Sequence, residues 1–219
     1  MLVGIREWLE RYVPQLQESG VPHEDAVAAT LLGADIAVAH QTCYGDDNTP
    51  VHFAAFEAPY PEAGGCIASV ISQATEGVPD AYAVFALGIS RRLTRACNET
   101  GRRIDPSIVR FAIAVHEVRH RVQLREPHIR KFLREHAYSS RWTDQSALIV
   151  ATTMEENYRV DEELLRNRGC SDETITLATS DKEFDADMVE RLFLHRYLTF
   201  KSFDEVAAFI RMPAPVRVP

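Results

Sequence analysis

The sequence of 219 residues contains no run of about 18 consecutive apolar side chains, the length that a helix needs to cross a membrane. Charged residues also appear early, at Arg6 and Glu7, too soon for the apolar region of a secretory signal peptide. We therefore expect a chain that neither spans a membrane nor carries a secretion signal.

Cysteine is scarce, and Cys43, Cys66, Cys97 and Cys170 are scattered along the chain without forming a CxxC pair. This spacing argues against a disulfide scaffold and against a zinc site built from thiolates. We expect reduced thiols and a cytoplasmic location.

Basic residues are almost missing from the first 90 positions, which hold two Lys or Arg against 12 Asp or Glu. Residues 91–134 reverse the balance with 12 against four, and residues 135–219 are acidic again with 10 against 16. The net charge of −8 argues against a dedicated nucleic-acid binder. We expect the acidic flanks to pack against the basic middle, with nucleic-acid binding by residues 91–134 as an alternative.

The composition is that of a soluble globular protein, with 46% hydrophobic and 26% charged residues. The length predicts one domain with a small appendage. We expect an N-terminal helical and loop segment, residues 1–65, packed on a core domain of residues 66–219. The predicted fold class is α+β, mostly α, with a small sheet.

Apolar periodicity and capping residues predict the secondary structure. The expected helices span residues 4–18, 24–40, 66–76, 106–125, 128–138, 144–168 and 181–197, with a final short helix starting at Asp204. The apolar run AYAVFALGI at 81–89 is the best strand candidate. Residues 42–65 are rich in Pro and Gly and predict a long loop, which we expect to border the functional cleft.

The predicted helix 106–125 contains the sequence His116-Glu117-Val118-Arg119-His120, which has the form HExxH. Two residues four apart on a helix differ by about 40° around its axis, so both imidazoles can reach one metal ion. Zinc is bound by such neutral nitrogen donors, with one position left open in catalytic sites. Glu117 cannot share the ligand position, but its carboxylate can take a proton from water at the open one.

A second acidic motif, Glu183-Phe184-Asp185-Ala186-Asp187, begins 63 residues after His120, near the start of the predicted helix 181–197. A third ligand must come from another element that crosses the first helix, and Glu183 qualifies. Asp187 lies one turn further on the same face and can accept a hydrogen bond from the far nitrogen of a ligand histidine. An alternative explanation of these acidic residues is their favourable position at the positive end of the helix dipole.

HEVRH followed by EFDAD resembles the HExxH…ExxAD pair of gluzincin metallopeptidases, especially the HtpX and CAAX-prenyl-protease type, and also the shorter ImmA/IrrE-type zincins. The resemblance implies a zincin-like fold in which His116, His120 and Glu183 bind zinc. It implies Glu117 as the general base and Asp187 as the orienting partner. It covers residues 81–197 at most, and it also implies that the strand at 81–89 is the edge strand to which a peptide substrate adds.

Other residues are alternative candidates for the predicted metal site. Glu126 stands where metzincin-like enzymes have a third ligand, but Gln123 replaces the glycine that their chain needs there. Cys97 precedes the motif as a ligand cysteine does in peptide deformylases, without their glycine-rich context. Candidates for stabilising the transition state are the polar residues near the third-ligand helix, namely His195, Arg191 and Tyr158.

These observations predict a zinc-dependent metallopeptidase that acts on a peptide or protein substrate and has no membrane partner. The alternative is an inactive zincin-like protein, a pseudopeptidase, that serves as a binding or regulatory module.

Overall fold

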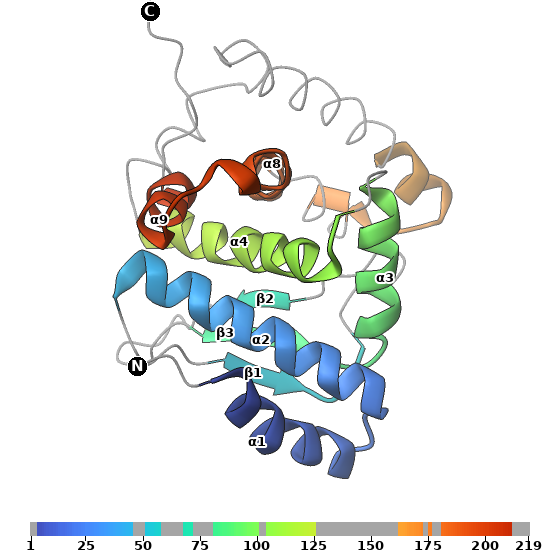
Figure 1. Cartoon of the computed structure of the whole chain (residues 1–219). Helices are drawn as coiled ribbons and strands as arrows, with labels where there is room; N and C mark the ends of the chain where they lie inside the picture. Colours follow the sequence, from blue (N-terminus) through green and yellow to red (C-terminus); the bar gives the residue numbers. More distant parts are fainter. Residues whose placement is uncertain are drawn as a thin grey trace, which may run out of the picture.

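The computed structural model describes residues 4–45, 51–57, 68–71, 81–100, 104–125, 162–172, 175–176 and 181–211. Within these ranges the chain is mostly helical with a small sheet, as predicted (Figure 1). The elements are α1 (Ile5–Glu18), α2 (His23–Tyr44), β1 (Val51–Ala54), β2 (Ala68–Ile71), β3 (Ala81–Phe85), α3 (Ile89–Glu99), α4 (Pro106–Arg125), α8 (Asp181–Arg196), the 3-10 turn η2 (Tyr197–Thr199) and α9 (Phe203–Arg211).

The long helices begin and end close to where the sequence predicted. α4 spans the predicted residues 106–125, and Asp105 caps it by accepting hydrogen bonds from the backbone nitrogen and the hydroxyl of Ser107. The predicted helix 128–138 lies outside the described residues. So does most of the predicted helix 144–168, of which residues 162–167 are helical.

In the part of the chain that the structure describes, the sheet has three strands in the order β1-β3-β2, with β1 parallel and β2 antiparallel to β3. Two expectations about it were wrong. Residues 68–71 form β2 where a short helix was predicted, and β3 is the central strand of the sheet where the resemblance implied an edge strand. All five residues of β3 are buried, which suits a strand paired on both sides.

The predicted strand 81–89 ends at Phe85, and α3 begins at Ile89 after a turn in which Gly88 has a positive φ of 76°. α3 was not predicted from the sequence, because the cap of this helix comes from a distant part of the chain. Asp25 on α2 accepts hydrogen bonds from the backbone nitrogens of Gly88 and Ser90, at 2.8 and 2.9 Å. A cap supplied from 63 residues away leaves no local pattern.

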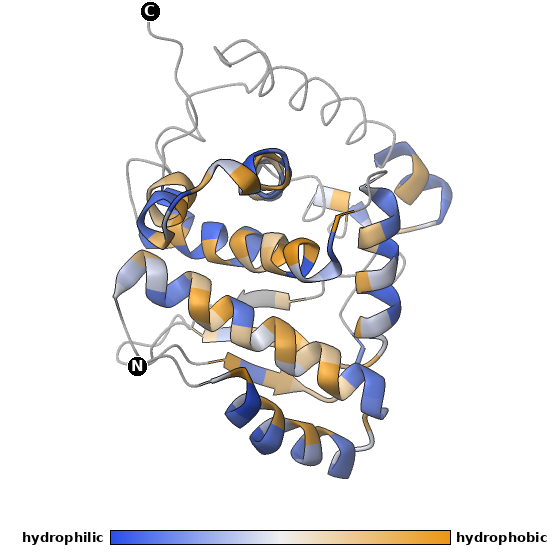
Figure 2. Cartoon of the chain, viewed as in Figure 1, coloured by the Kyte–Doolittle hydropathy of each residue, from blue (hydrophilic) through white to orange (hydrophobic). Residues whose placement is uncertain are grey.

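α2 occupies the centre of the fold and contacts α1, α3, α4, α9, β1 and β3. Figure 2 shows this helix coloured mostly hydrophobic, whereas α1 carries hydrophilic residues on its outer side. Gly33 lets α2 approach β1, because a Cβ atom there would lie 2.6 Å from Cζ of Phe53. α2 is also the one helix among the described residues that is long and apolar enough to cross a membrane, although 61% of that window is buried in the fold.

Residues 42–44 of the predicted loop 42–65 continue α2, and the ring of Tyr44 lies against the guanidinium groups of Arg121 and Arg125 on α4. The next described part of this segment is residues 51–57. It includes β1, whose Phe53 packs on Trp8 and Tyr12 of α1. β1 is at one end of the sheet, while β2, at the other end, is the strand that contacts α4. Residues 51–57 therefore do not support the expectation that this segment borders the cleft, and residues 46–50 and 58–65 lie outside the described residues.

Candidate metal centre

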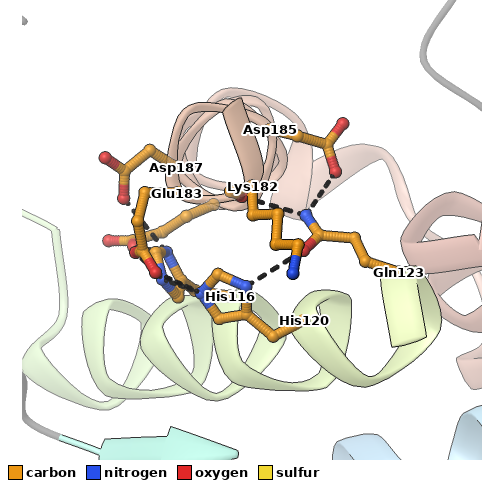
Figure 3. Close-up of polar contacts among 8 residues, drawn as sticks. His116, His120, Gln123, Lys182, Glu183, Asp185 and Asp187 are labelled. Atoms are coloured by element: carbon orange, nitrogen blue, oxygen red, sulfur yellow. Dashed lines mark hydrogen bonds and ion pairs between the residues drawn. The ribbon is translucent and has the colours of Figure 1, made fainter. Parts of the chain in front are cut away.

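Two crossing helices build the candidate site. α8 lies across α4 on the side opposite to α2 and the sheet (Figure 1), and these two helices share the most extensive packing between elements in the described structure. Ala186 is fully buried where they meet, and its small side chain allows the close approach. Figure 3 shows His116 and His120 extending from α4 toward Glu183 and Asp187 on α8.

The two imidazoles and one carboxylate converge on a common point. Nε2 of His116 lies 3.0 Å from Nε2 of His120. Glu183 closes the triangle, with one oxygen 3.5 Å from Nε2 of His116 and the other 3.3 Å from Nε2 of His120. The structure thus brings together the three residues predicted as metal ligands, from helices 63 residues apart. The side chains of both histidines are mostly buried, and that of Glu183 is 37% exposed.

The other ring nitrogen of His116 faces two carboxylates. Its Nδ1 lies 3.0 Å from Oδ1 of Asp187 and 3.2 Å from Oε2 of Glu190. Asp187 therefore stands beside the far nitrogen of a histidine, as the sequence predicted for an orienting residue. His116, Asp187 and Glu190 also form a second group whose atoms lie close enough together to hold a metal ion.

The other ring nitrogen of His120 faces an amide. Its Nδ1 lies 3.1 Å from Oε1 of Gln123, while Nε2 of Gln123 donates to Oδ2 of Asp185 at 2.8 Å and to the carbonyl of Lys182 at 3.0 Å (Figure 3). Gln123 is 1% exposed, so these hydrogen bonds are shielded from water. The two histidines consequently face different chemical groups, carboxylates at ion-pair distance in one case and a neutral amide in the other.

A buried ion pair fixes the crossing of the helices. Arg119 donates to both carboxylate oxygens of Asp185, at 2.6 and 3.0 Å, and to the carbonyl of Ile210 at 2.8 Å. Both partners are inaccessible to water, so removing either one would leave a buried charge without its counterion. This pair joins α4 to α8 and α9 through the residue that directly precedes His120.

Glu117 occupies a different face of α4. Its side chain is buried, and its Oε2 has no hydrogen-bond partner among the residues that the structure describes. Burial raises the pKa of this carboxyl, while the charges of His116 and His120 oppose the increase. Glu117 is not a member of the ligand group, and its role as a proton acceptor stays a prediction from the sequence.

The carboxylates dominate the electrostatics of the site. Burial disfavours a charged His116, but Asp187, Glu183 and Glu190 outweigh it and raise the pKa of His116 well above its usual value. Burial likewise opposes the charge on Glu183, but hydrogen bonds with the two histidines hold the pKa of this carboxyl well below its usual value. In the metal-free protein, the surrounding carboxylates therefore favour the protonated form of His116.

The remaining candidates do not join this group. Arg191 and His195 are exposed on α8, and a rise of 1.5 Å per residue puts them about 12 and 18 Å along the helix from Glu183. Cys97 is half-buried on α3, where burial and then the charge of Asp105 raise the pKa of its thiol. Tyr158 and Glu126 lie outside the described residues, so their roles stay predictions.

Several residues of the site were not singled out from the sequence. Glu190 lies seven positions after Glu183, on the same helix face as Asp187, and this spacing could have identified it. Gln123 was considered only as the residue in place of a metzincin glycine, although it lies one turn after His120. The pairing of Arg119 with Asp185 has no signal in the sequence, because it depends on how the helices cross.

No protein-family profile, no curated protein and no solved structure matched this chain significantly. The function must therefore be argued from the arrangement of the residues themselves.

Proposed function

We propose that this protein is a zinc-dependent metallopeptidase whose metal is held by His116, His120 and Glu183. The observation that supports this most strongly is the convergence of the two Nε2 atoms and the Glu183 carboxylate, at 3.0, 3.3 and 3.5 Å from one another. In a tetrahedral zinc site with bonds of about 2.0–2.2 Å, ligand atoms are separated by roughly 3.3–3.6 Å. The two nitrogens are slightly closer than this, and each oxygen of Glu183 lies within this range from one of the two histidines.

The composition of the ligand group also suits zinc. Two imidazole nitrogens and one carboxylate are a common set in catalytic zinc sites, which keep the fourth position for water or substrate. Among the residues described, this group has three members, and Glu183 is partly exposed. A structural zinc site more often has four protein ligands.

Each residue of the site has a separate role in the proposed hydrolysis of the peptide bond. When bound, zinc supplies Lewis-acid chemistry, because it polarises a carbonyl and lowers the pKa of a coordinated water. Glu117 accepts the proton of the attacking water at its carboxylate and passes it to the nitrogen of the leaving amine. Asp187 and Glu190 hold the ring of His116, and Gln123 holds that of His120.

The test is Glu117→Gln in a casein-hydrolysis assay. We expect the variant to bind zinc with unchanged stoichiometry and to lose hydrolysis, because an amide cannot accept the proton. Glu10→Gln, on the exposed face of α1, is the matched control and should keep full activity. Loss of zinc from Glu117→Gln would contradict the assignment. A wild-type protein that binds zinc without any turnover would favour the alternative, a binding or regulatory module.

A further inference from the structure

The hydrogen bonds of Gln123 determine which way round its amide lies. Oδ2 of Asp185 and the carbonyl oxygen of Lys182 are acceptors, so the end of the side chain that faces them must be the NH₂ group. Asp185 is itself held by the Arg119 guanidinium, and accepts from it through both oxygens. The carbonyl oxygen of Gln123 is therefore left facing Nδ1 of His120.

This orientation has a consequence for His120. An amide oxygen only accepts hydrogen bonds, so Nδ1 of His120 must carry the proton in their 3.1 Å contact. A neutral imidazole has one N–H, and its Nε2 must then present a lone pair. That nitrogen is the one that faces His116 and Glu183.

We propose that Gln123 is a positioning residue that holds His120 in the Nδ1–H form, so that its Nε2 lone pair points at the metal. The proposal rests on the proposed function, since a lone pair directed at this point matters only if a cation binds there. A series of hydrogen bonds fixes the orientation of the Gln123 amide. It runs from the Ile210 carbonyl through Arg119 and Asp185 to Gln123, and from there to His120.

Two variants separate this role from simple packing. Gln123→Met has nearly the same shape but neither accepts from His120 nor donates to Asp185. Gln123→Glu keeps an acceptor for Nδ1 of His120 but loses the donated bonds and adds a charge beside Asp185. The control, Thr30→Val, removes one buried hydrogen bond, from Thr30 to the Ala26 carbonyl, far along the chain from the site.

The first measurement is a long-range ¹H–¹⁵N correlation spectrum of the metal-free protein, over a pH series that reaches the neutral imidazole. Wild type, Gln123→Glu and Thr30→Val should show the Nδ1–H form of His120. Gln123→Met should show a substantial fraction of the Nε2–H form. An unchanged Nδ1–H form in Gln123→Met would overturn the proposal.

The second measurement is zinc affinity by competition with a chromogenic chelator, set beside the free energy of unfolding. Gln123→Met should lose about 10–100-fold in affinity, typical for residues that orient a metal ligand. Gln123→Glu should be the less stable variant and yet keep its affinity. If zinc affinity fell in both variants in proportion to their free energy of unfolding, the positioning role would be overturned. Wild-type protein that fails to bind zinc, with the tautomers as expected, would overturn the proposed function and support the effect of Gln123 on His120.

Discussion

Two helices of this protein carry shielded carboxylates, and they use them differently. On α2, Asp35 pairs with Arg110 of α4 at 2.6 Å, and Asp25 caps α3 by accepting from Gly88 and Ser90. On α8, Glu183, Asp187 and Glu190 all approach the imidazoles of α4. On α2, each carboxylate is paired with hydrogen-bond donors of its own. On α8, three carboxylates surround the same two imidazoles.

The two groups of carboxylates differ in whether their negative charge is balanced by neighbouring described residues. An Asp–Arg pair or a helix cap is complete in itself, because charge and hydrogen-bonding capacity balance. Among the described residues, three carboxylates around two neutral imidazoles carry an excess of negative charge, which protons or a cation can neutralise. The raised pKa of His116 expresses this excess in the metal-free protein. We therefore assign the carboxylates of α2 to folding and propose that those of α8 belong to a binding site.

The largest expected effect on metal binding comes from Glu183→Ala. The substitution removes a charge and one of three ligand atoms, so zinc affinity should fall by far more than the 10–100-fold typical of an orienting residue. Competition with a chromogenic chelator measures it, after circular dichroism has shown that the variant folds. Glu126→Ala should change the affinity little. If Glu126→Ala released the metal and Glu183→Ala retained it, the third ligand would lie next to HExxH.

A smaller effect is expected from the two carboxylates at Nδ1 of His116. Because Asp187 and Glu190 share this nitrogen, Asp187→Ala alone should weaken zinc binding by about 10-fold, near the lower end for orienting residues. The double variant with Glu190→Ala should approach about 100-fold. A double variant no weaker than the single one would show that Glu190 takes no part in orienting the ring.

The pH dependence of stability should differ between the metal-free and the zinc-loaded protein. The pKa of His116 is raised above the ordinary histidine value of 6.5, so its contribution to stability is complete below that pH. The contribution is lost as the pH rises through the raised pKa. Urea unfolding with a chelator present should therefore show stability falling above neutral pH. With saturating zinc the fall should disappear, because metal affinity increases as the histidines lose protons. Equal profiles in both conditions would contradict this.

The smallest effect on the site is expected from Asp25→Ala. Burial alone would raise the pKa of Asp25, but hydrogen bonds from Ser90 and Gly88 outweigh it and lower the pKa below its usual value. Loss of this cap should cost about 1–2 kcal/mol of unfolding free energy. Zinc affinity should stay within error of wild type. A large loss of affinity would mean that the two regions are not independent.

The sequence was informative where the determining interactions are local. The period of apolar residues and the Asp105-Pro106 cap located α4 to the residue. It was misleading for the short strand β2, since four residues contain too little periodicity to distinguish strand from helix. It was also uninformative for α3, whose cap comes from Asp25 on another helix.

The candidate site divides in the same way. His116 and His120 lie one turn apart on a single helix, so their convergence could be predicted from spacing alone. The position of Asp187 beside His116 required only that the two helices cross. The roles of Gln123 and Arg119 depend on the point at which they cross, because Asp185 must reach both side chains. That point is set by packing across the whole core.

The most direct test of the central claim is anomalous scattering at the zinc edge from a crystal grown with zinc. The account predicts one peak between the Nε2 atoms of His116 and His120 and the carboxylate of Glu183, about 2.0–2.2 Å from each. No peak at this point, or a peak on the Nδ1 side of His116 between Asp187 and Glu190, would contradict it.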